Sequence, residues 1–203
     1  MFTEESENES ADDDTSLGAE EIEPSGIMID RSTLFAGRVF EDDPSCFMQL
    51  CQAHGLPMVS LCDTPGFMVG PDAEQQGTVR HVSRMFVSAA SLSIPFFTVV
   101  LRKGYGLGAM AMAGGDLHAP VLTVAWPTGE FGGMGLEGAV RLGFRDELAA
   151  ITDETARRAR YDELVAGYYE RGKALGVATV FEIDDVIDPA DTRAVVSRAL
   201  RGR

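Results

Sequence analysis

Apolar runs that each lead into a glycine-rich segment constrain the fold of this chain most. LPMVSLCD (56–63), SIPFFTVVL (93–101) and HAPVLTVAWP (118–127) are short and carry almost no charge. Such runs are typical of strands that are buried on both faces of a sheet. Because helical patterns separate them, the sequence predicts an α/β domain with helices covering both faces. Ligands bind in such folds where strands end and helices begin.

Three helical patterns accompany these strands. CFMQLCQAH (46–54) has apolar residues at helical spacing and ends before a glycine. A second helix is expected from Asp72, an N-cap candidate, to about Ala89. A third, short and apolar, is expected at GAMAMAGG (108–115). Between the first strand and the second helix, DTPGFMVGP (63–71) holds two prolines and two glycines, which predicts a structured turn.

The C-terminal part of the chain, about 146–203, is charged and helical. It follows a second glycine-rich segment, TGEFGGMGLEGAVRLGF (128–144), which is expected to run from a loop into a helix. The next pattern fits either one long amphipathic helix or two helices broken at Thr152–Asp153. A last helix is expected from Ala190 to Leu200.

The acidic charge is concentrated at the N-terminus. Residues 1–25 hold ten Asp or Glu and no Lys or Arg, whereas the remainder carries 22 acidic and 17 basic side chains. Because such a segment buries too little apolar surface to offset its ordering entropy, we expect residues 1–25 to be disordered and residues 26–203 to form the domain. The segment is either a solubilising or mis-started leader or a tail that docks on a basic partner.

The composition argues against several classes of protein. The chain has no basic stripe that could neutralise phosphates, so nucleic-acid binding is not expected. No apolar stretch approaches the ~18 residues of a membrane span, and MFTEESENES has no secretory features, so a cytoplasmic location is expected. Cys46, Cys51 and Cys62 lack the paired spacing of a zinc site. We therefore expect reduced thiols, no disulfide and no bound metal.

LRKGYGLGA (101–109) has three glycines in five positions at the exit of the second predicted strand. It lacks the Lys-Ser/Thr ending of a P-loop and the spacing of a dinucleotide fingerprint. Two interpretations remain. The glycines either permit a tightly packed turn, or they expose backbone N–H groups at a helix N-terminus to an oxygen that gains negative charge, as in an oxyanion hole. GEFGGMG (129–135) allows the same two kinds of interpretation, packing or lining of a binding cleft.

Three ordered segments carry a resemblance to a known family: DTPGFMVGPDAEQQGTVRHVSRMF (63–86), PFFTVVLRKGYGLGAMAMAGG (95–115) and AWPTGEFGGMGLEGAVRLGF (125–144). Over roughly residues 46–203, the chain resembles the C-terminal half of the carboxyltransferases of biotin-dependent acyl-CoA carboxylases. The resemblance implies a crotonase-like spiral of ββα units, incomplete at its N-terminal side. It also implies carboxyl transfer from N-carboxybiotin to the α-carbon of an acyl-CoA, such as acetyl- or propionyl-CoA.

The resemblance further implies site residues. The backbone of Leu107 and Gly108 would form the family's second oxyanion hole, and Gly106 would allow a ligand to approach it. The biotin anion can itself take the α-proton of the thioester, so no protein base is required. The other residues expected to bind substrate or biotin are Ala109, Met110, Asp63, Thr64, Pro65, Gly66, Phe67, Gly132, Gly133 and Met134.

The partners that the resemblance implies are an acyl-CoA and a biotin carried on a biotin carboxyl carrier or biotin carboxylase subunit. Family members are oligomers in which the N-terminal half of one subunit faces the C-terminal half of another. A complementary half is therefore expected as a partner, and no turnover is expected from the chain alone. The alternative is a non-catalytic remnant or an assembly subunit. A hydratase or isomerase would need an acid/base carboxylate, for which Glu130 and Glu137 are the nearby candidates.

Several single residues keep two interpretations. Asp63 either caps backbone amides in its turn or contacts substrate. Arg102 and Lys103 either meet a carboxylate or phosphate or point into solvent. Arg80 and His81 either complete a helix surface or face the biotin pocket.

Overall fold

Six strands form one sheet in the part of the chain that this computed structural model describes, residues 27–29, 44–67, 69–75 and 77–201. The strands are β1 (Ile27–Ile29), β2 (Met58–Thr64), β3 (Phe96–Tyr105), β4 (Leu122–Ala125), β5 (Glu130–Gly132) and β6 (Asp185–Val186). Their order is β1-β2-β3-β4-β6, and β5 pairs with the end of β3. β1 is antiparallel to β2, and the four other pairings of these strands are parallel. The three predicted strands are confirmed as β2, β3 and β4, whereas the predicted acidic leader lies outside the described residues.

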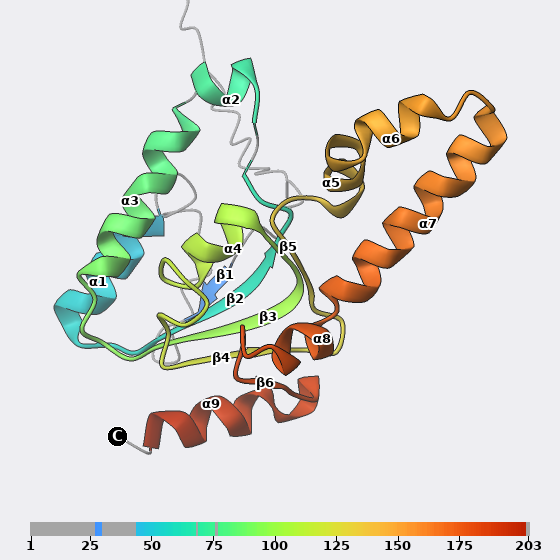
Figure 1. Cartoon of the computed structure of the whole chain (residues 1–203). Helices are drawn as coiled ribbons and strands as arrows, with labels where there is room; N and C mark the ends of the chain where they lie inside the picture. Colours follow the sequence, from blue (N-terminus) through green and yellow to red (C-terminus); the bar gives the residue numbers. More distant parts are fainter. Residues whose placement is uncertain (1–26, 30–43, 68, 76, 202–203) are drawn as a thin grey trace, which may run out of the picture.

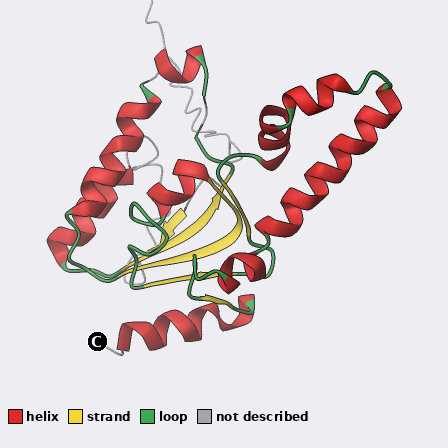
Figure 2. Ribbon diagram, in the orientation of Figure 1, coloured by secondary structure: helices red, strands yellow, loops and turns green. Residues whose placement is uncertain are grey.

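Helices cover both faces of this sheet (Figures 1 and 2). The α-helices of the described residues are α1 (Pro44–His54), α2 (Pro71–Gln75), α3 (Thr78–Ala90), α4 (Gly106–Met112), α5 (Leu136–Gly143), α6 (Arg145–Ala150), α7 (Glu154–Gly172), α8 (Ala174–Thr179) and α9 (Thr192–Arg201). Figure 1 shows α1, α3 and α4 on one face and α9 on the other, while α5, α6 and α7 extend away from the sheet. The prediction of an α/β domain is confirmed.

Two apolar clusters, one on each face of the sheet, hold the layers together. Phe96 and Val100 of β3 pack with Met48 of α1 on the face that α4 also covers. Val99 of β3 points to the opposite face, where Val195 of α9 packs against its cluster. The first five residues of β3 are all buried. Burial from both sides explains why this strand is a continuous apolar run without alternation.

A glycine breaks the helix that was expected from Asp72. The structure has two helices there, α2 and α3, and Gly77 lies between them with a φ of 72°. This left-handed conformation suits glycine because it has no Cβ. The Gly77 N–H donates to the carbonyl of Glu74, 3.0 Å away, and so closes the end of α2. The start near residue 72 is confirmed, but the prediction of one continuous helix is wrong.

β3 is longer than predicted and includes the first part of the glycine loop. The strand continues to Tyr105 because its last three residues pair with β5, and Gly104 also pairs with Thr64 of β2. β5 itself lies inside a segment that was expected to be a loop. As a consequence α4 begins at Gly106, directly after the strand and earlier than predicted.

The C-terminal helices follow the broken alternative. α6 ends at Ala150 and α7 begins at Glu154, and Oδ2 of Asp153 accepts a hydrogen bond of 2.7 Å from the N–H of Ala156. A further break at Lys173, whose ψ is 141°, separates α7 from α8. Within the described ranges, no helix combines the length and the apolar character needed to cross a bilayer.

Candidate functional site

The ends of β2, β3 and β5 lie side by side. Gly104 of β3 pairs with Thr64 of β2 on one side and with Phe131 of β5 on the other. Because these three strands are parallel, their carboxyl ends meet at the same end of the sheet, where α/β folds bind ligands. The DTPGF, GYGLGA and GEFGGMG segments, far apart in the sequence, are therefore brought together there.

Backbone-to-backbone contacts between glycines join these three segments. A Cβ on Gly108 would lie 2.9 Å from the Cα of Gly66 and 3.1 Å from Oγ1 of Thr64. A Cβ on Gly106 would lie 2.7 Å from the carbonyl oxygen of Gly133, and the φ of Gly106 is 57°. The tight-packing interpretation of the glycine loop accounts for both positions.

The backbone N–H groups in the first turn of α4 receive no side-chain cap from the described residues. N–H groups in the first turn of a helix have no partner inside the helix. Tyr105 occupies the N-cap position in an extended conformation, and no side chain of the described residues caps this helix end. The side chain of Leu107 is 65% exposed, whereas Gly108 is buried below the DTPG turn. Among the described residues, no side-chain cap therefore occupies the backbone N–H groups of this first turn.

The turn after β2 is held by its own polar side chains. Oδ1 of Asp63 accepts a hydrogen bond of 3.0 Å from the N–H of Lys103, and Oδ2 lies 3.1 Å from the guanidinium of Arg102. Oγ1 of Thr64 accepts a bond of 3.2 Å from the N–H of Gly66. Asp63 thus binds a backbone amide of the neighbouring strand, and the Arg102 side chain has a protein carboxylate as its partner.

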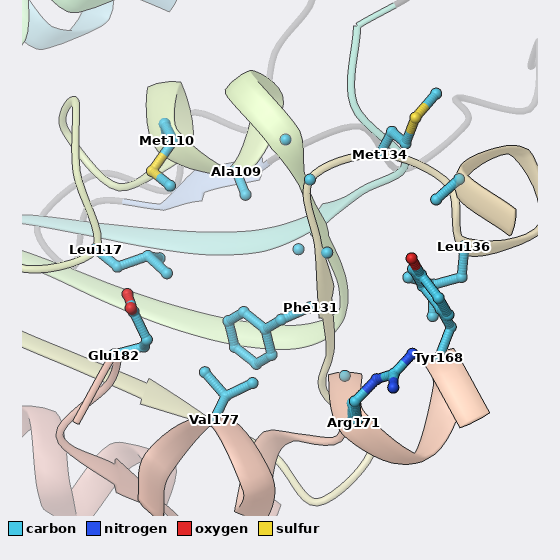
Figure 3. Close-up of a pocket in the computed structure, with 16 residues that line it drawn as sticks. Ala109, Met110, Leu117, Phe131, Met134, Leu136, Tyr168, Arg171, Val177 and Glu182 are labelled. Carbon is cyan, nitrogen blue, oxygen red and sulfur yellow. The ribbon is translucent and has the colours of Figure 1, made fainter. Parts of the chain in front are cut away.

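A pocket of about 730 Å³ lies between α4, β5, α5, α7 and α8. Figure 3 shows Phe131 between Leu117 on one side and Tyr168 on the other. Most of the lining side chains are apolar, and five glycines contribute backbone alone. The lining residues are Gly104, Gly106, Ala109, Met110, Leu117, Phe131, Gly132, Gly133, Met134, Leu136, Ala139, Tyr168, Arg171, Gly172, Val177 and Glu182.

The residues singled out from the sequence divide between this pocket and the turn beside it. Those that line the pocket are Gly106, Ala109, Met110, Gly132, Gly133 and Met134. Those that do not are Leu107 and Gly108 in the first turn of α4, and Asp63, Thr64, Pro65, Gly66 and Phe67 in the turn after β2. Arg80 and His81 are exposed on α3 and are not part of the pocket lining. Both groups therefore belong to one region, but only the first group surrounds a cavity.

Two tyrosine–glutamate pairs next to the pocket were missed by the sequence analysis. Oη of Tyr105 donates to Oε2 of Glu130 at 2.9 Å, and Oη of Tyr169 donates to Oε1 of Glu137. Burial and then this hydrogen bond raise the pKa of Tyr105. The hydrogen bond to Glu137 raises the pKa of Tyr169 to about 12, and the same bond lowers the pKa of Glu137. Both carboxylates considered for acid/base chemistry are thus bound by phenols.

Neither pair had a signal in the sequence, because the partners are 25 and 32 residues apart. Cys46 is exposed, Cys51 and Cys62 are buried, and none of the three forms a disulfide bond. Across the described ranges, no group of three or more His, Cys, Asp or Glu side chains is placed to hold a metal ion.

Comparison with known proteins gives consistent matches. The sequence model of the carboxyl transferase domain matches residues 25–202. The methylmalonyl-CoA carboxyltransferase 12S subunit of Propionibacterium freudenreichii subsp. shermanii is 37% identical over 179 residues, which cover 86% of this chain and 33% of that protein. The propionyl-CoA carboxylase carboxyltransferase subunit of Haloferax mediterranei is 40% identical over 148 residues, which cover 72% of this chain and 28% of that protein.

Solved structures agree with these matches. A single-chain, multi-domain long-chain acyl-CoA carboxylase superposes with a TM-score of 0.68 and 59% identity, over 78% of this chain and 15% of that one. The transcarboxylase 12S hexamer superposes with a TM-score of 0.72 and 35% identity, over 79% of this chain and 30% of that one. The chain thus spans about a third or less of the length of these relatives. The expected crotonase-like fold is confirmed by these neighbours.

Proposed function

Because the chain belongs to the carboxyl transferase domain family, we propose that it takes part in the transfer of a carboxyl group from N-carboxybiotin to the α-carbon of an acyl-CoA. Relatives named for methylmalonyl-CoA and propionyl-CoA support an acyl-CoA as the acceptor. Carboxylases of short acyl groups and of long acyl groups are both represented among the matches. The short class includes the acetyl and propionyl groups expected from the sequence, and the long class is that of the 59% identical carboxylase.

The observation that carries this proposal is the uncapped start of α4, where the three glycine segments meet beside the pocket. A carrier-borne biotin supplies the carboxyl group and, when bound, presents a ureido oxygen that gains negative charge. The backbone N–H groups of Leu107 and Gly108 hold that charge, because they have no partner within the helix. Gly66 and Gly133 fix the position of these donors by direct contact with Gly108 and Gly106.

The partners follow from the same proposal. A biotin carrier brings the carboxyl group, and a second crotonase-like half supplies the remaining acyl-CoA surface. We propose that the working form is an oligomer, as in the hexamer described for the transcarboxylase 12S protein. The chain by itself is then expected to give no carboxyl transfer.

The experiment that tests this proposal removes one backbone N–H donor without removing a buried side chain. Leu107→Pro deletes the N–H of Leu107, and proline is tolerated in the first turn of a helix. Leu107→Ala keeps the N–H and trims a side chain that is 65% exposed. The rate to be measured is malonyl- or methylmalonyl-CoA formation by the chain mixed with a complementary carboxyltransferase half and carboxylated carrier.

Loss of one such donor costs about 10²–10³ in rate in known enzymes, so we expect a loss of this size in Leu107→Pro and a rate close to that of the unmodified chain in Leu107→Ala. Equal rates in the two variants would refute the role of this backbone. A folded chain that gives no transfer in the mixture would favour the assembly role instead. Gly108→Pro is a poorer test, because the added atoms would meet the Gly66 backbone.

A further inference from the structure

The loop that joins β5 to α5 has little of its own to hold it in one conformation. It comprises Gly133, Met134 and Gly135, and we name it the β5–α5 loop. Glycine leaves the backbone its greatest freedom, and a Cβ at either glycine would meet no atom of the described residues within 4 Å beyond its chain neighbours. The side chain of Met134 is 44% exposed. Contacts on either side of the loop therefore have to set its position.

The position of this loop bears on the start of α4. A Cβ on Gly106 would lie 2.7 Å from the carbonyl oxygen of Gly133, so the two backbones are in direct contact. Gly106 is the first residue of α4, and the N–H groups of Leu107 and Gly108 follow it in the same turn. A shift of the β5–α5 loop would therefore remove the support of these N–H groups on one side.

Tyr105 ties the start of α4 to β5. It directly precedes Gly106, it is buried, and it pairs with Gly132 between β3 and β5. Gly132 carries no side chain, and Cδ1 of Tyr105 lies 3.7 Å from the place that a Cβ would take there. Glu130 precedes Gly132 by two residues and so lies on the same face of the strand. The tyrosine reaches past Gly132, and its Oη donates to Oε2 of Glu130 at 2.9 Å.

Tyr169 ties the other end of the loop to α7. Its Oη donates to Oε1 of Glu137, which lies in the first turn of α5 and follows Gly135 by two residues. Figure 1 shows α5 beside α7. The bond from Tyr169 lowers the pKa of Glu137, so the carboxylate is ionised at neutral pH and the hydrogen bond is charge-assisted. One phenol–carboxylate bond thus holds each end of the β5–α5 loop.

The two tyrosine–glutamate pairs are close enough to interact with each other. After burial and its own hydrogen bond to Glu130, the charge of Glu137 also contributes to the raised pKa of Tyr105. In the same way, after its hydrogen bond to Glu137 and burial, the charge of Glu130 contributes to the raised pKa of Tyr169. The pairs therefore form one cluster that joins β3, β5, α5 and α7.

We propose that the two tyrosine–glutamate pairs clamp the β5–α5 loop against the start of α4. Tyr105 and Tyr169 then act as positioning residues, because they hold the backbone beside the Leu107 and Gly108 donors. The inference rests on the proposed function for the role of these donors, whereas the clamp itself is a property of the free chain. A misplacement of about 1 Å away from the reacting atoms can cost about 10²-fold in rate, so the rigidity of this loop has a measurable consequence.

The clamp is tested first in the full chain without ligands, by NMR order parameters of backbone N–H groups. Tyr169→Phe deletes one hydroxyl, and the order parameters of Gly133 and Gly135 are expected to fall from the rigid value of about 0.85 to below about 0.6. Tyr161→Phe is the matched control. Its hydroxyl accepts a hydrogen bond of 3.3 Å from Nε of Arg141, so it also joins α7 to α5, but away from the loop.

The control is expected to leave the order parameters of the loop unchanged. A loop as rigid in Tyr169→Phe as in the unmodified chain would overturn the proposal. Equal losses of order in Tyr169→Phe and Tyr161→Phe would overturn it as well, because any weakening of the contact between α5 and α7 would then have the same effect.

Glu137 allows the hydrogen bond to be restored without the charge. The side-chain oxygen of Glu137→Gln can still accept from Tyr169, whereas Glu137→Ala removes the acceptor. Glu137 is exposed, so both variants are expected to fold, and thermal unfolding checks this. Should Tyr169→Phe not fold, Glu137→Ala breaks the same bond and replaces it. We expect a loose loop in the Ala variant and a rigid one in the Gln variant, and equal looseness in both would overturn the proposal.

The same variants are then measured in the complemented mixture that forms malonyl- or methylmalonyl-CoA. Tyr169→Phe is expected to lower kcat by about tenfold or more with little change in KM, and Glu137→Gln is expected to keep most of the rate that Glu137→Ala loses. A looser loop in Tyr169→Phe, with no transfer by the unmodified mixture, would refute the proposed function and leave the clamp assigned. Transfer at an unchanged rate in Tyr169→Phe, with an equally rigid loop, would refute the clamp and leave the proposed function standing.

Discussion

The geometry of this site depends on single glycines at positions where no side chain can be accommodated. Gly108 lies against the backbone of Gly66, and Gly106 lies against the carbonyl of Gly133. Each contact joins segments that are distant in the sequence, so the glycines fix the relative position of the three strand ends. Backbone contacts of this kind cannot be relieved by a change of rotamer, because no flexible side chain is involved.

Replacing Gly108 by Ala is expected to destabilise the protein. Alanine in a helix interior is favoured over glycine by about 1 kcal/mol, but its Cβ would lie 2.9 Å from the Cα of Gly66. Overpacking against rigid surroundings costs about 1–3 kcal/mol. The steric cost is therefore expected to win, with a net loss of about 1 kcal/mol in the free energy of unfolding measured in urea.

Gly167 provides the matched control for this substitution. It lies inside α7, and a Cβ there would meet no atom within 4 Å apart from the backbone of its own helix and its chain neighbours. Gly167→Ala is expected to raise the free energy of unfolding by about 0.5–1 kcal/mol through helix propensity alone. A stabilising effect of Gly108→Ala equal to that of Gly167→Ala would show that the contact with Gly66 is loose.

At the scale of elements, the sequence predicts which strands and helices exist better than where they end. The apolar runs predict β2, β3 and β4 because burial on both faces leaves a clear pattern. The end of β3 was placed too early, because Lys103 and Gly104 carry no strand signal and belong to the strand only through pairing with β5. The break at Gly77 was missed for a similar reason. A glycine inside a helical pattern is ambiguous until its φ is known.

The start of α7 depends on a local hydrogen bond that can be tested. Asp153 caps the helix by accepting from the N–H of Ala156 at 2.7 Å, and its charge also interacts favourably with the helix dipole. Asp153→Ala is expected to cost about 1 kcal/mol of unfolding free energy. Faster hydrogen exchange is expected in the first turn of α7, which extends from the body of the protein (Figure 1).

Asp153→Asn separates capping from charge. Its side-chain oxygen can still accept the bond, so it is expected to lose no more than a few tenths of a kcal/mol. The explanation by capping would be wrong if Asn and Ala cost the same.

For the whole molecule, the sequence predicted the α/β fold and the region of the site, but not the pocket. The three glycine segments carry a local signal, and the parallel sheet brings them to one end. The far wall of the pocket comes from Tyr168, Arg171 and Val177 on α7 and α8. In the sequence, nothing distinguishes these side chains from other residues of a helix. They line the pocket because the C-terminal end of α7 packs against β5. Gly172 lies at this contact, because a Cβ added to it would lie 2.5 Å from the carbonyl oxygen of Phe131.

The stability of the whole molecule is expected to fall at alkaline pH because a buried thiol and a hydrogen-bonded tyrosine hold their protons in the folded state. Burial, with a smaller effect from the charge of Asp63, raises the pKa of Cys62 from 9.0 to about 12. The hydrogen bond to Glu137 raises the pKa of Tyr169 to about 12. A folded-state pKa above the unfolded value means that the unfolded chain loses the proton first as pH rises. The stabilisation is therefore complete below pH 9 and is lost as pH rises toward 12.

The Cys62 contribution can be isolated because its thiol begins to titrate before the tyrosines do. Between about pH 9 and 10, the unfolded chain releases the Cys62 proton while the folded chain keeps it, which lowers the free energy of unfolding by up to about 1.4 kcal/mol per pH unit. Cys62→Ala is expected to be less stable at neutral pH, since the side chain is fully buried, but to show a shallower decline across this range. Cys46→Ala, at an exposed thiol, is expected to keep the original slope. Parallel declines in Cys62→Ala and the unmodified chain would mean that the Cys62 thiol does not control alkaline unfolding, and that the loss of stability begins instead at the tyrosine–glutamate pairs beside the pocket.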